Sequence, residues 1–127
     1  MAGAYMADTP MAAINSHMKA ISEKNLQDLR SGSEYPFVHI DEFGSKDWYA
    51  TSDDMLDFPT WNNPDFGGAE ITHSLVISST GDLNVYLLTV QLMTVQQELG
   101  DRVQAIWAVS RQEEGWLVSW RQFLGVI

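Results

Sequence analysis

The sequence predicts an α+β fold, in which N-terminal helices pack on a curved, mostly antiparallel sheet. Apolar residues near the start of the chain recur at the three- and four-residue spacing of an amphipathic helix. The C-terminal half instead contains long runs rich in Val, Ile, Leu, Thr and Trp, in which apolar and polar residues alternate. Tight-turn signals separate these runs, so we expect consecutive strands to be antiparallel neighbours.

Length and composition indicate one globular domain, residues 1–127. Hydrophobic residues make up 45% of the chain, which is enough to bury a core. The net charge of −10 argues against nucleic acid or an anionic membrane as a partner, because both require clustered Lys and Arg. The absence of Cys excludes disulfides, thiolate metal sites and a Cys nucleophile.

Residues 1–8 are predicted to form a flexible N-terminal extension. They lack the basic segment and the apolar run of a signal peptide. No apolar stretch in the chain approaches about 20 residues, the length that crosses a bilayer. We therefore expect a cytoplasmic protein.

Two helices are predicted before the first strand. Thr9 is a good N-cap, and Pro10 at the first helical position loses no hydrogen bond there. The apolar stripe of this helix consists of Met11, Ile14, Met18 and Ile21, and His17 falls off it. A second, short helix is expected over residues 26–29, with Asn25 as its cap and the segment 31–33 as its end.

The remaining elements follow in order along the chain. Residues 35–40 are rich in strand formers, and residues 46–51 are their expected hairpin partner. A short acidic helix begins at Ser52, and residues 62–68 form a loop. The four long strands are expected over residues 70–79, 83–97, 102–112 and 116–126.

Alternation assigns a face to each side chain of the long strands. In the third, one face carries Val103, Ala105, Trp107 and Val109. In the last, Trp116, Val118, Trp120 and Gln122 oppose Leu117, Ser119, Arg121 and Phe123. Because both faces of the sheet contain apolar residues, we expect helices to cover one face and a second subunit the other, which predicts a homodimer.

The order of elements and the C-terminal segment AIWAVSRQEEGWLVSWRQFLGVI resemble the nuclear transport factor 2-like superfamily, particularly its SnoaL-like bacterial members with a cystatin-like fold. Trp107, Gly115 and Trp116 match the bulky residue and the Gly-Trp pair of its last two strands, and EYPFVHI matches a phrase in uncharacterised members. The resemblance implies a cone-like sheet closed by helices, a pocket at the open end, and dimers formed through the outer face of the sheet. It leaves function open, because some members are isomerases, cyclases or dehydratases and others are binding proteins.

His73 is the first candidate general base. It alternates with Ile71 and Leu75, so we expect it to share their apolar face and to be desolvated there. A lone His in such a place is more often structural than catalytic, and both interpretations stay open.

His39 and Asp41 are the second candidate, because they stand two positions apart on a predicted strand and therefore share a face. In one interpretation they form an acid–base pair directed into the pocket. In the favoured interpretation, Val38 and Ile40 face the core and the polar pair lies in water. Tyr49, Trp120 and Arg121 are possible hydrogen-bonding or wall residues beside them, and Arg121 could equally face a partner subunit or solvent.

Two functional hypotheses follow. The first is a non-catalytic binding protein for a small apolar ligand, with His39, Tyr49, Met93 and Trp120 as candidate ligand-binding residues. The alternative is a cofactor-free isomerase, cyclase or dehydratase of a carbonyl compound, with His73 or Asp41 as catalytic base. No cofactor or metal is predicted, since Asp53 and Asp57 form at most a carboxylate pair in an acidic rim that would repel anions.

Overall fold

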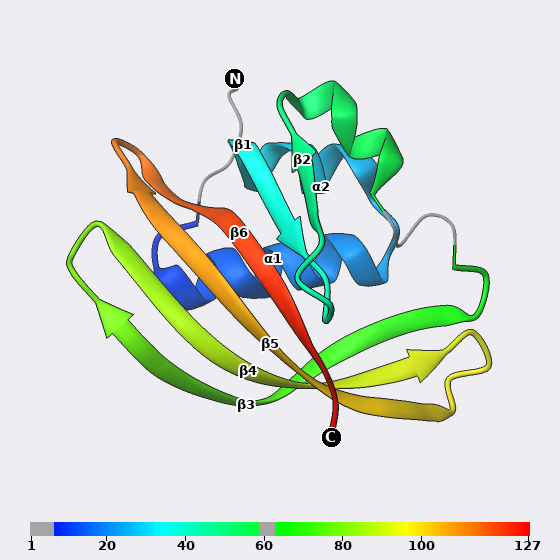
Figure 1. The fold of residues 1–127 in the computed structure, drawn as a ribbon. Coiled ribbons are helices and arrows are strands. Elements are labelled where there is room, and N and C mark those ends of the chain that lie inside the picture. Colours follow the sequence, from blue (N-terminus) through cyan, green and yellow to red (C-terminus); the bar gives the residue numbers. More distant parts are fainter. Residues whose placement is uncertain (1–6, 59–62) are drawn as a thin grey trace.

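The computed structural model describes residues 7–58 and 63–127 (Figure 1). Two α-helices and one 3-10 helix precede the long strands: α1 (Pro10–Ser22), α2 (Leu26–Ser31) and η1 (Ser52–Asp57). The strands are β1 (Ser33–Ile40), β2 (Lys46–Tyr49), β3 (Phe66–Ser79), β4 (Leu83–Thr94), β5 (Leu99–Gln112) and β6 (Gly115–Val126). Together they form the predicted α+β architecture.

The six strands form one sheet in the order β2-β1-β6-β5-β4-β3. All neighbouring strands are antiparallel except β1 and β6, which are parallel. The sheet curves strongly, and α1 lies along its concave side, in contact with β3, β5 and β6 (Figure 1). This arrangement confirms the prediction of helices packed on a curved, mostly antiparallel sheet.

Both predicted helix caps are present. The Thr9 hydroxyl accepts a hydrogen bond from the Ala12 amide at 3.1 Å, and the Asn25 side chain accepts one from the Asp28 amide at 3.0 Å. The α1 face that packs on the sheet includes His17, which is 1% exposed. The expectation that His17 lies off the buried stripe is therefore wrong.

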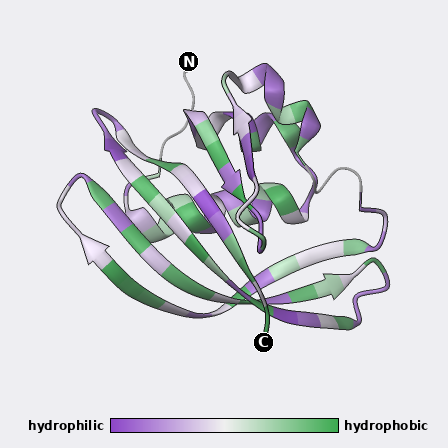
Figure 2. Ribbon diagram, viewed as in Figure 1, coloured by the Kyte–Doolittle hydropathy of each residue, from purple (hydrophilic) through white to green (hydrophobic). Residues whose placement is uncertain are grey.

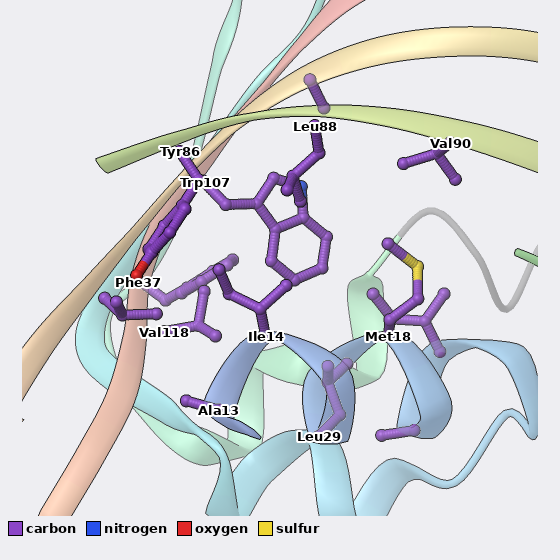
Figure 3. Packing of buried hydrophobic residues seen from close by; sticks show 14 of the residues in the cluster. Ala13, Ile14, Met18, Leu29, Phe37, Tyr86, Leu88, Val90, Trp107 and Val118 are labelled. Carbon is purple, nitrogen blue, oxygen red and sulfur yellow. The ribbon is translucent and has the colours of Figure 1, made fainter. Parts of the chain in front are cut away.

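Trp107 occupies the centre of the core between α1 and the sheet. Figure 3 shows its indole projecting from β5 toward Ile14 of α1, with Leu88 of β4 and Phe37 of β1 nearby. All four side chains are at most 1% exposed. Figure 2 shows hydropathy alternating along the long strands, as expected for strands that place Leu88 and Trp107 on the inward face.

A β-bulge in β6 changes the face of the side chains that follow it as far as Phe123, after which a second register shift occurs. Val118 pairs with Val109 of β5, but the next pair is Trp120 with Ala108, so Ser119 is an extra residue in β6. Val118 points inward, and beyond the bulge the inward side chain opposite Trp107 is Arg121. The alternation assumed from sequence is correct before the bulge and reversed between it and the second register shift after Phe123.

Hydrogen bonds hold the bulge in place. The Ser119 hydroxyl donates to Glu34 of β1 at 3.1 Å and also forms a hydrogen bond with Ser110 of β5. The Glu34 carboxylate further accepts from the Gln112 side chain at 2.6 Å. Side chains from both neighbouring strands therefore fix the extra residue of β6.

The β4–β5 turn lies earlier than predicted. It spans residues 95–98, where the Gln97 amide donates to Thr94 and the Thr94 amide donates to Glu98, both at 2.9 Å. Gln97 supplies the left-handed conformation, with φ of 63°. Residues 99–101, predicted as a turn from Gly100, instead begin β5.

Near the N-terminus, Ala7 is buried and forms an isolated antiparallel bridge to Trp116, whose amide donates to the Ala7 carbonyl at 3.0 Å. Residues 1–6 of the predicted flexible extension, and residue 62 of the predicted loop, lie outside the described residues. Within the described ranges, no helix has the length and apolarity needed to cross a bilayer.

Candidate functional site

The candidate site is an apolar cavity between α1 and the concave face of the sheet. Its volume is about 160 Å³. Apolar side chains from α1 and all four long strands form most of its wall, among them Met18, Ile21, Phe66, Val90, Leu92 and Phe123. Trp107 closes one side, and Arg121 is the single charged side chain among the described lining residues.

Arg121 reaches the cavity because of the bulge in β6. The guanidinium lies between two aromatic rings, with Cζ 5.0 Å from the centroid of Phe58 and 4.9 Å from that of Trp107. Its Nη1 atom is buried and has no hydrogen-bond partner among residues 7–58 and 63–127. Burial lowers the pKa of Arg121 to about 10, so the side chain is still cationic at neutral pH.

His39 lies directly beside Arg121. The two residues are register partners on the parallel strands β1 and β6. His39 is 9% exposed, and its Nδ1 is buried without a partner in the described part of the chain. Burial, and then the charge of Arg121, lower the pKa of His39 to about 4 against the opposing effect of Asp41, so the imidazole is neutral at pH 7.

His17 is also held neutral. Burial first, and then Arg121, place its pKa well below the ordinary value. The Ser33 hydroxyl donates its proton to the Leu29 carbonyl at 2.8 Å, so at its 2.9 Å contact with His17 Nε2 it must accept. His17 therefore carries its proton on Nε2, and its ring stands edge-on to Trp107 with the centroids 5.1 Å apart.

Tyr49 of β2 completes the polar surroundings of Arg121. It is 4% exposed, and its ring centroid lies 5.7 Å from that of Phe58. Burial and then the charge of Asp47 raise the pKa of Tyr49 to about 12, although Arg121 acts in the opposite direction. The phenol therefore stays protonated, and the group around Arg121 contains one cation and neutral side chains.

The favoured interpretation of the first strand is wrong. Phe37 and His39 face the core, whereas Val38 and Ile40 line a shallow groove on the opposite side of the sheet. The pairing of His39 with Arg121 explains the difference, because it places His39 on the inward face. Burying a neutral imidazole there costs less than burying a charge.

The other predicted site residues lie away from the cavity. His73 is exposed on β3, so the expected desolvation is absent. Asp41 ends β1 in a turn, where its carboxylate accepts hydrogen bonds from the Phe43 and Ser45 amides, both at 2.9 Å. The catalytic roles of His73 and Asp41 stay predictions.

Of the candidate ligand-binding residues, Met93 is half-buried on β4 and is not among the residues that line the cavity. Trp120 lines the groove on the outer face, because it follows the bulge. Arg121 was named as a possible residue beside His39, although the alternation placed it on the face opposite Trp107. His17 is the member of the site that was missed, because it was left off the stripe. The spacing of His17 from Ile14 and Ile21, three and four residues, is the signal that could have found it.

No family model and no curated protein sequence matches the chain. Several solved structures, however, superpose on the chain over most of its length. A nuclear transport factor 2-like protein of unknown function in nutrient uptake from Rhodospirillum rubrum superposes with a TM-score of 0.74 at 15% identity, covering 94% of this chain and 99% of that one. A nuclear transport factor 2-like protein from Cytophaga hutchinsonii gives 0.73 at 10% identity, covering 92% and 94%.

A candidate calcium/calmodulin-dependent protein kinase type II association domain from Thiobacillus denitrificans also gives 0.74 at 15% identity, covering 94% of this chain and 96% of that one. Identities this low show the fold alone. The chain has the nuclear transport factor 2-like fold, an α+β cone closed by helices. This confirms the fold that the resemblance in the sequence implied.

Proposed function

We propose that the protein binds a small, mostly apolar molecule in the cavity between α1 and the sheet. The observation that carries this proposal is the cavity itself, which apolar side chains from five elements surround. Burial of apolar ligand surface against these side chains supplies the binding free energy.

The cavity volume limits the size of the ligand. An apolar protein cavity of about 150 Å³ accommodates one benzene molecule. At about 160 Å³, this cavity suits a ligand with one ring or a short branched chain. A four-ring steroid would require α1 to move away from the sheet.

The polar groups beside the cavity favour binding over acid–base catalysis. A general base works best when its pKa lies near the operating pH. His39 has a pKa of about 4, and Tyr49 has one of about 12. Neither is matched to proton transfer at pH 7.

Benzyl alcohol is a neutral probe of suitable size. At ten times its dissociation constant it is expected to add roughly 1.4 kcal/mol to the free energy of unfolding, which raises Tm by a few degrees. Ala105→Leu fills the cavity, since Ala105 lines it, and is expected to remove this shift in a thermal unfolding assay.

Ala50→Leu is the matched control, because it makes the same change at an exposed position after β2. This variant should respond to benzyl alcohol as the unaltered protein does. A shift that survives Ala105→Leu, or no shift in the unaltered protein, would contradict binding in the cavity.

We also propose that a second copy of the chain covers the outer face of the sheet. Val38, Ile40, Trp48 and Trp120 line an apolar groove there, and Trp48 is 64% exposed. The Thiobacillus neighbour of the same fold is described as an association domain, which supports assembly through this scaffold. A homodimer is also what the two-sided apolar pattern of the strands predicts.

Sedimentation equilibrium tests this interface. The protein is expected to sediment at twice its mass of 14.3 kDa, and Trp48→Glu is expected to shift it to the monomer because a charge is placed in an apolar contact. Phe43→Glu, at an 87% exposed aromatic outside the groove, should leave the dimer intact. A monomer at all concentrations would refute the proposal.

A further inference from the structure

We propose that Arg121 is the anchor for an anionic group, and that the ligand class is a small apolar carboxylic acid bound as its carboxylate. The proposal rests on the binding function above and specifies its chemistry. It follows from three features of the described residues: a half-buried cation without a counterion, a guanidinium held between rings whose buried Nη1 has no described partner, and a cavity that fits one small apolar body.

The charge of Arg121 has no counterion in the described ranges. No carboxylate there forms an ion pair with its guanidinium, and the groups around it are His17, His39 and Tyr49, all neutral at pH 7. Arg121 is half-buried, and a cation partly withdrawn from water without a counterion is costly. The two aromatic rings offset part of this cost, and a bound carboxylate would offset much more.

The geometry prepares the guanidinium for such a partner. Phe58 and Trp107 contact it within 5.0 Å of their centroids and so restrict its rotation. The buried Nη1 remains available to donate, and the planar fork of an arginine matches the two oxygens of a carboxylate. His39, on the adjacent strand, also has a buried atom without a described partner, Nδ1, but it is not among the residues that line the cavity, so the anchor rests on Arg121.

The rest of the cavity selects a monoanion with an apolar body. A phosphate dianion needs several donors, and the described lining offers one charged side chain among apolar ones. A carboxylate presents a single charge, and its ring or branched chain can fill the remaining volume of about 160 Å³. The net charge of −10 repels an anion that approaches through the solvent, but salt screens this repulsion over roughly 8 Å.

Isothermal titration with benzoate and benzyl alcohol tests the anchor, since the two probes share a ring and differ in charge. We expect the unaltered protein to bind benzoate at least tenfold more tightly. Arg121→Met keeps an apolar stem and removes the charge, so benzoate should bind about 10- to 100-fold more weakly, as expected for a lost charged hydrogen bond. Benzyl alcohol affinity should fall by a clearly smaller factor than benzoate affinity, because the alcohol carries no charge.

Arg102→Met is the matched control, because Arg102 is exposed at the start of β5 and should alter neither affinity. Circular dichroism verifies that each variant is folded. Arg121→Lys provides a second variant, which keeps the charge and loses the fork, and should weaken benzoate binding by a smaller factor.

The outcomes separate this inference from the function on which it rests. Benzyl alcohol binding without a preference for benzoate would overturn the anchor and leave the apolar binding site standing. Benzoate binding that neither Arg121 variant weakens would also overturn the anchor. Failure of both probes to bind would overturn the anchor and the binding function together.

Discussion

Replacing Trp107 by Ala is expected to destabilise the domain by about 3–5 kcal/mol, the usual cost of removing a large buried aromatic side chain. The indole is 1% exposed and lies between α1 and the sheet (Figure 3). It also contacts His17 edge-on and covers the guanidinium of Arg121. The substitution therefore removes core packing and one aromatic partner of a buried cation at the same time.

Urea unfolding followed by circular dichroism measures this loss as a lower midpoint. Phe43→Ala is the control, because Phe43 is 87% exposed and lies outside the groove, so its removal should change the free energy of unfolding by no more than about 0.5 kcal/mol. Equal losses for the two variants would show that Trp107 does not have the central role in packing described here.

Acidification from pH 7 to pH 5 is expected to cost about 2 kcal/mol of stability through His39 alone. The pKa of His39 is about 4 in the folded protein and about 6.5 in the unfolded chain. Below pH 6.5 the unfolded chain therefore binds a proton that the folded protein does not. The stabilising effect is complete above pH 6.5 and is lost as the pH falls toward 4, and His17 acts in the same direction.

Urea unfolding at pH 7 and pH 5 tests this effect when the loss of stability is compared between variants and the unaltered protein. The carboxylates are the same in all of these proteins, so their contribution cancels in the comparison. His39→Gln should lose about 2 kcal/mol less than the unaltered protein over this range. His73→Gln, which alters the exposed histidine on β3, should lose as much as the unaltered protein. Parallel losses in all three proteins would refute the assignment of His39 as a buried neutral group.

Local signals in the sequence were sufficient for most of the fold. Thr9 and Asn25 cap their helices as expected, and the strand runs are present with shifted ends. These features depend on the spacing of nearby residues and on the residue types in the turns, both of which can be identified in a single sequence. The parallel pairing of β1 with β6 depends on contacts between distant parts of the chain, and no local pattern specifies it.

The candidate site was harder to predict because it depends on one bulge. Strict alternation placed Trp120 inward and Arg121 outward, and the extra residue Ser119 reverses both. The hydrogen bonds that fix Ser119 come from Glu34 and Ser110, on two other strands. The face of Arg121 is thus a tertiary property, and the same holds for His39, whose inward position follows from its pairing with Arg121.

The position of β6 in the sheet determines when the cavity beside Arg121 can form during synthesis. The hairpin of β1 and β2 and the meander of β3 to β5 both leave the ribosome earlier, yet β6 lies between them and joins them. The nascent chain therefore exposes two separate sheet edges until residues 115–126 emerge, and such edges attract chaperones or aggregation partners. A ligand that needs Arg121 can stabilise the finished domain and cannot assist any earlier stage of its cotranslational folding.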